Sequence, residues 1–116
     1  MQILAVGNTA NEISTLHKLA GEAFPGCSCE AYLDPLLAIK SYQQKKPDLT
    51  IFNLSMQKID GFTFTRTLRL CCSDFTGLML AEDDSCRRDA GNFQLSFLVK
   101  PITALQLREV WARLNQ

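Results

Sequence analysis

The residue types that most often carry chemistry are sparse in this chain. The only His is His17, and the Cys residues at positions 27, 29, 71, 72 and 86 contain no Cys-x-x-Cys pair. We therefore expect neither a zinc site nor a disulfide framework. Free thiols without a targeting segment favour the cytoplasm. Cys86 precedes two Arg residues and is expected to be the most exposed thiol, whereas the other four are expected to pack as small apolar side chains.

The composition is that of an ordinary folded domain. The 116 residues are 47% apolar, and 12 basic residues balance 12 acidic ones. The balance holds in both halves, and the basic pairs Lys45-Lys46 and Arg87-Arg88 are isolated, so direct nucleic-acid binding is not expected. No apolar run approaches the ~20 residues that a membrane span needs. The length predicts one domain, residues 1–116.

Five short apolar runs predict five β-strands. Three of them contain continuously apolar stretches, as do strands that are buried on both faces of a parallel sheet. The second run alternates, which is typical of an edge strand. The predicted strands are Gln2–Val6, Cys27–Tyr32, Leu49–Asn53, Gly77–Ala81 and Leu95–Val99.

Helical patterns separate and follow these runs. Residues 10–24, 62–72 and 103–115 place apolar side chains at helical spacing, with Thr103 as a cap. Asp34-Pro35 is a helix start, and that helix is expected to run to about Lys45. The segment 83–90 is weak, so we expect one or two turns there, capped within Asp83–Ser85. Strand and helix thus alternate five times, which predicts an α/β parallel sheet with helices on both faces in three layers.

Two stretches within this pattern resemble the receiver domain of bacterial response regulators, the signalling modules of two-component phosphorelays. Lys46–Gly61 is similar to that family's third strand, phosphoacceptor position and following loop. Phe97–Ile102 is similar to its fifth strand and the Lys-Pro pair that follows. The resemblance covers essentially the whole chain. It implies a flavodoxin-like (βα)5 doubly wound sheet with strand order 2-1-3-4-5.

The same resemblance implies a degenerate phosphorylation site. The family holds Mg²⁺ and phosphate with acidic residues, a hydroxyl group and a Lys at the carboxyl ends of its strands. Gly7 and Asn8 stand at the positions of the acidic pair, and Asn53 stands at the phosphoacceptor position. Ala81 replaces the hydroxyl residue, and only Lys100 matches. We therefore expect no metal, no aspartyl phosphate, no cofactor and no enzyme activity.

The neighbours of Lys100 decide how its charge is neutralised. Asn8 and Asn53 are expected to hydrogen-bond Lys100 and nearby backbone. Glu82 begins an acidic run, residues 82–84, directly after the fourth predicted strand. Its carboxylate is expected either to be solvated near a helix start or to pair with Lys100, because a buried Lys without a counter-charge is costly.

Phe97 and Leu105 concern the surface through which the domain would act. Phe97 matches the family's switch aromatic, and since Ala81 offers no hydroxyl, we expect one packed position for its ring. Leu105 lies opposite the apolar stripe of its helix and should be exposed. In the family, the face formed by the fourth helix, fifth strand and fifth helix docks proteins or a second copy.

The leading hypothesis is a pseudo-receiver: an interaction module, independent of phosphorylation, that binds a protein partner or a second copy, with a DNA-binding output domain beyond Gln116 as an option. The alternative is a small-ligand sensor in which an anion pairs with Lys100 in the emptied pocket. A thiol-based redox protein is a third hypothesis, with no Cys placed obviously at a strand's carboxyl end.

Overall fold

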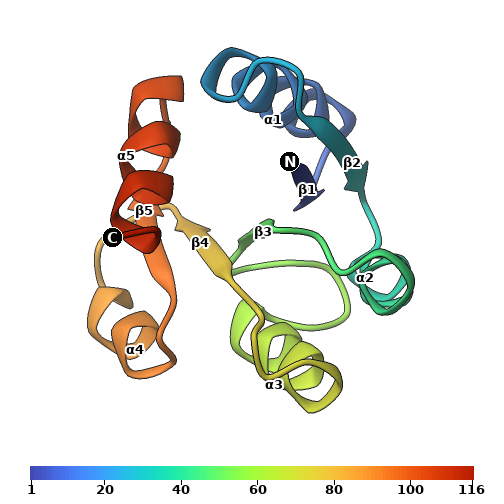
Figure 1. Ribbon diagram of the computed structural model, residues 1–116. Coiled ribbons are helices and arrows are strands. Elements are labelled where there is room, and N and C mark those ends of the chain that lie inside the picture. Colours follow the sequence, from blue (N-terminus) through green and yellow to red (C-terminus); the bar gives the residue numbers. More distant parts are fainter.

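Five strands and five helices alternate along the chain, as the sequence predicts (Figure 1). The computed structural model describes residues 1–116. The strands are β1 (Gln2–Val6), β2 (Ser28–Tyr32), β3 (Leu49–Asn53), β4 (Gly77–Ala81) and β5 (Ser96–Val99). The helices are α1 (Ala10–Ala23), α2 (Pro35–Lys45), α3 (Gly61–Cys71), α4 (Arg87–Asn92) and α5 (Ala104–Leu114). None of these helices has the length and apolar character to cross a membrane.

The strands form one parallel sheet in the order β2-β1-β3-β4-β5, which confirms the expected topology. β3 and β4 are buried along their whole length, and β1 is buried from its second residue onward. β2 is an edge strand and is only partly buried, as its alternating sequence indicates. The parallel arrangement brings the carboxyl ends of all five strands to one edge of the sheet.

Two apolar clusters hold the helices against the sheet and give three layers. On one face, α1 and α5 pack on strand residues that include Ala5, Ile51 and Leu78. On the other face, α2, α3 and α4 pack around Phe52 and Met79. Figure 1 shows α1 and α5 on one side of the strands and the other three helices on the opposite side. Alternate residues of each central strand therefore serve opposite layers.

Side-chain caps fix the starts of the four longer helices. Thr9, Asp34, Asp60 and Thr103 each accept a hydrogen bond from a backbone N–H in the first turn. The short α4 confirms the expected one or two turns, but its expected cap within Asp83–Ser85 is wrong. Asp83 Oδ1 instead accepts from the Ser85 N–H and hydroxyl, and α4 begins without a side-chain cap.

The thiol exposures differ from the prediction at two positions. Cys71 is exposed, and its Sγ accepts a hydrogen bond from Gln43 Nε2 at 3.2 Å. Cys86 is only partly exposed, because it packs against the cluster around Phe52. The buried stripe of α3 ends at Leu68, so the apolar spacing that continues to Cys71 runs beyond the core.

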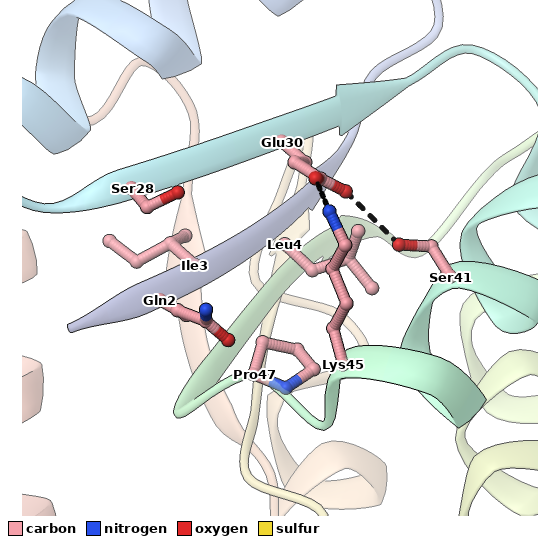
Figure 2. A pocket seen from close by; sticks show the side chains of 8 residues that line it. All are labelled: Gln2, Ile3, Leu4, Ser28, Glu30, Ser41, Lys45 and Pro47. Carbon is pink, nitrogen blue, oxygen red and sulfur yellow. Dashed lines mark hydrogen bonds and ion pairs between the residues drawn. The ribbon is translucent and has the colours of Figure 1, made fainter.

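A small pocket near the amino ends of β1 and β2 is a packing seam between the sheet and α2. Figure 2 shows that the Glu30 carboxylate in this pocket lies between Lys45 and Ser41, both from α2. The cavity is about 30 Å³. These contacts tie the edge strand β2 to α2.

Candidate functional site

The residues at the carboxyl edge of the sheet surround a cavity of about 160 Å³. Asn8, Asn53, Ala81 and Lys100 all line it, so the structure brings together four of the five positions expected in the pocket. The full lining is Asn8, Asn53, Leu54, Ser55, Leu80, Ala81, Glu82, Asp83, Ser85 and Lys100. Gly7 is buried beside α1 and is not part of the lining; a Cβ there would lie 3.0 Å from the Ile13 side chain.

The centre of the site is the carboxylate of Glu12, a residue that was not predicted from the sequence. Its Oε1 accepts from the Asn8 backbone N–H at 2.8 Å and from Asn53 Nδ2 at 2.7 Å. Its Oε2 lies 3.0 Å from Lys100 Nζ. One side chain from the first turn of α1 therefore joins the ends of β1, β3 and β5.

Local structure explains why Glu12 points into the site. The Thr9 hydroxyl accepts from the Glu12 N–H at 3.0 Å, which starts α1 at this point. A Thr followed three residues later by Glu is the spacing of a capping box, in which the Glu side chain turns back toward the start of the helix. Here the carboxylate reaches the Asn8 N–H, one residue before the cap. The Thr-x-x-Glu spacing was the signal that could have found this residue.

Lys100 is neutralised by two carboxylates. Its Nζ lies 3.0 Å from Glu12 and 3.0 Å from Glu82. The predicted pair with Glu82 is therefore confirmed. The predicted hydrogen bonds from Asn8 and Asn53 to Lys100 are wrong, because Asn8 Nδ2 donates to the Ser55 carbonyl and Asn53 Nδ2 donates to Glu12.

The two carboxylates differ in their surroundings. The Glu12 and Lys100 side chains are 20% and 21% exposed, whereas the Glu82 side chain is 84% exposed. Burial raises the pKa of Glu12, but hydrogen bonds from Asn8, Lys100 and Asn53 outweigh it and hold that pKa below its ordinary value. Burial lowers the pKa of Lys100, and Glu82 and Glu12 more than reverse this. Both groups of the inner pair are thus charged at neutral pH.

In the side-chain amides of Asn8 and Asn53, the nitrogen donates a hydrogen bond but the oxygen has no partner. Both nitrogens face acceptors, and turning either amide would place its oxygen against a carbonyl or carboxylate. Their orientations are therefore fixed. The Oδ1 atoms of both residues are buried without a hydrogen-bond partner. Buried acceptors of this kind normally have a partner.

Phe97 occupies a closed apolar position, and its single packed ring position stays a prediction. The side chain is 7% exposed and belongs to the cluster that contains Phe52 and Ala81. The Arg87 guanidinium lies 5.0 Å from the centre of its ring. Such a cation above an aromatic face is attractive and helps to hold the ring in place.

The site does not fit the Mg²⁺ and phosphoryl chemistry of the family that the sequence resembles. No group of three His, Cys, Asp or Glu residues could hold a metal ion. The one inner carboxylate, Glu12, is already bound to Lys100 and two amides. Mg²⁺ is usually held through carboxylates and phosphates, and the amide of Asn53 cannot act as the carboxylate nucleophile.

Comparison with known proteins shows the fold. No protein-family model matches the sequence, and no curated protein matches it significantly. The chemotaxis protein CheY4 of Vibrio cholerae superimposes with a TM-score of 0.84 at 22% identity, over 97% of this chain and 96% of that chain.

Two further solved structures agree. A response regulator receiver domain protein from Clostridium thermocellum gives a TM-score of 0.81 at 16% identity over 92% of this chain and 87% of its own. The receiver domain of the Francisella response regulator 1452 gives 0.81 at 17% identity, over 98% and 93%. The chain therefore has the flavodoxin-like fold of CheY.

Proposed function

We propose that this chain is a receiver domain of a response regulator whose pocket no longer accepts phosphate. It acts as an interaction module that is independent of phosphorylation. One observation carries this proposal: the Glu12 carboxylate lies between Asn53 and Lys100 and holds the charge that a phosphoryl group would bring. The shared fold with receiver domains supports the family assignment.

Charge supports the loss of phosphorylation. An incoming phosphoryl group would meet two carboxylates, Glu12 and Glu82, already placed on the single cation of the pocket. Like charges at such distances repel, and the partly buried setting screens them weakly. For the same reason the geometry gives no support to an anion sensor, because Lys100 is not free to pair with an added anion.

The surface formed by α4, β5 and α5 supports the interaction role. A groove of about 370 Å³ lies there, lined by apolar side chains that include Leu95 and Phe97 and by the two arginines Arg87 and Arg113. Leu105 on α5 is 56% exposed, as the sequence predicts. We assign this face, hereafter the α4-β5-α5 face, to a protein partner or a second copy.

The remaining parts of the proposal follow from composition. The balanced charge favours a protein partner over direct contact with nucleic acid. The five free cysteines favour the reducing cytoplasm.

Two measurements test the proposal. Incubation with acetyl phosphate and Mg²⁺ should leave the intact mass unchanged, with an active receiver domain as the positive control; gain of one phosphoryl group contradicts it. Sedimentation velocity over a range of concentrations tests whether this face docks a second copy. Leu105→Glu should weaken the association, whereas Leu70→Glu, at a leucine that is 89% exposed on α3, should not.

A further inference from the structure

A groove between α3 and the turn after α4, hereafter the α3-α4 groove, shares no residue with the pocket at the carboxyl edge or with the groove on the α4-β5-α5 face. Its volume is about 420 Å³, and it is lined by Thr65, Arg66, Arg69, Leu70 and Phe93. Leu70 is 89% exposed, more than any other large apolar side chain of the chain. Single exposed leucines are common, but this one lines the same groove as an aromatic ring and two cations.

Contacts between α3 and the turn after α4 hold the groove in shape. The Arg69 guanidinium donates to the backbone carbonyls of Phe93 and Gln94, the second at 3.3 Å. The Phe93 ring packs on the Phe62 ring of α3, with 4.8 Å between the ring centres. The groove is therefore formed in the free domain, and a partner loses no affinity to ordering it.

The groove is positively charged and has no counter-charge of its own. α3 contains Arg66 and Arg69 and no acidic residue. Neither guanidinium forms an ion pair within the chain. The Arg66 guanidinium lies 5.2 Å from the centre of the Phe93 ring, which holds the cation in place. Arg66 makes no other polar contact, so its N–H donors are free to bind a carboxylate.

Charge distinguishes between the possible occupants of the groove. In a symmetric contact with a second copy, four arginines would meet without a carboxylate, and like charges repel. The two arginines are also fewer than the about four to eight basic residues of a lipid-binding cluster, and the chain as a whole has no net positive charge for nucleic acid. A protein segment with an acidic and an apolar side chain side by side matches both the cations and Leu70.

We propose that the α3-α4 groove docks an acidic segment of another protein in which an Asp or Glu lies next to a Leu or Phe. The carboxylate pairs with Arg66, and the apolar side chain packs against Leu70 and Phe93. This surface is additional to the α4-β5-α5 face and does not rest on the role proposed for that face.

The test is a titration with a capped hexapeptide of alternating Asp and Leu, followed by amide NMR. We expect saturable shifts at the backbone of residues 65–71 and 92–95 and at the Nε–H of Arg66. The peptide with Asn in place of Asp keeps the apolar side chains and should bind about fivefold more weakly, the upper range for an exposed ion pair. The peptide with Ser in place of Leu keeps the charge and should give no saturable shift.

Three outcomes of this titration overturn the proposal. The first is the absence of saturable shifts at these residues with the peptide of Asp and Leu. The second is equal affinity for the peptide of Asn and Leu. The third is an equal response of the same signals to phosphatidylserine vesicles or to single-stranded DNA, which would assign the groove to a lipid surface or to nucleic acid.

Two variants locate the binding, and both change exposed side chains, so the amide spectrum should stay that of the folded domain. Arg66→Gln and Leu70→Ala should each weaken the affinity for the peptide of Asp and Leu by about fivefold. Arg108→Gln on α5 and Leu37→Ala on α2 are the matched controls, because these exposed residues do not line the groove. Unchanged affinity in Arg66→Gln or Leu70→Ala, or an equal loss in the controls, contradicts the assignment.

Discussion

Two carboxylates lie at the same distance from Lys100 Nζ but differ in burial. Replacing each in turn therefore shows how burial changes the contribution of an ion pair to stability. Glu12→Gln and Glu82→Gln each remove one carboxylate at 3.0 Å. The Glu12 side chain is 20% exposed and accepts two further hydrogen bonds, whereas Glu82 is 84% exposed. We expect the two substitutions to differ strongly in their effect on the free energy of unfolding.

The magnitude follows from the ion pair and hydrogen bonds that each substitution removes. Breaking a fully buried ion pair costs about 3–5 kcal/mol, but the inner pair is one-fifth exposed and Lys100 keeps Glu82. A Gln carbonyl can also keep one of the hydrogen bonds. We therefore expect Glu12→Gln to cost about 2 kcal/mol, which corresponds to a fall in Tm of about 8 °C for a domain of this size. Glu82→Gln should cost about 0.5 kcal/mol or less.

The assay is urea unfolding at neutral pH and low salt, followed by the fluorescence of Trp111, the only Trp in the chain. Trp111 packs edge-on against Phe24, so its signal reports the folded state. In the double variant Glu12→Gln, Lys100→Met, the two losses should be less than additive. Equal costs for Glu12→Gln and Glu82→Gln, or full additivity in the double variant, would refute the assignment of Glu12 as the main partner of Lys100.

Three other predictions concern acidity, charge and thiols. Because the native pKa of Glu12 lies below its ordinary 4.5, the stabilisation by its carboxylate is complete above pH 4.5 and is lost as the pH falls through the native pKa. Between pH 7 and pH 3, the free energy of unfolding in urea should therefore fall less for Glu12→Gln than for the wild type. Asn53→Asp replaces a donor 2.7 Å from Glu12 with a second carboxylate, so it should destabilise the fold by about 2 kcal/mol at neutral pH, and by less in acid. Among the thiols, Cys71 is exposed and should react first with a disulfide reagent, whereas burial raises the pKa of Cys29 to about 11 and should make it among the slowest; mass spectrometry of the labelled peptides checks the order.

The fold was predictable because its signals are local. The apolar runs that became β3 and β4 and the caps Asp34 and Thr103 can be found within a few neighbouring residues. The strand order came from the family resemblance and not from periodicity. Cys71 was placed wrongly because helical spacing predicts a side chain's direction along a helix but not where the covering layer ends.

The site was only partly predictable, because its central contacts join distant parts of the chain. The Glu82 pair with Lys100 was one of two alternatives considered for Glu82, because both residues follow neighbouring strands. Glu12 lies 88 residues from Lys100 and 41 from Asn53. Its Thr-x-x-Glu spacing indicates a helix start, but only the folded sheet brings Lys100 to that helix start. The sequence alone showed that positions 7, 8 and 53 carry no carboxylate, but it did not show that the carboxylate of Glu12 contacts Asn53 and Lys100.

The central claim is that Glu12 neutralises Lys100 and leaves no place for a phosphoryl group. The most direct test is the response of the pocket to a phosphoryl analogue. Amide NMR spectra should be recorded with and without beryllofluoride and Mg²⁺, for the wild type and for an active receiver domain as the positive control. Because Glu12 already occupies the space between Asn53 and Lys100, we predict unchanged shifts for residues 53–55, 81–85 and 97–100. A saturable shift centred on Asn53 would contradict the account.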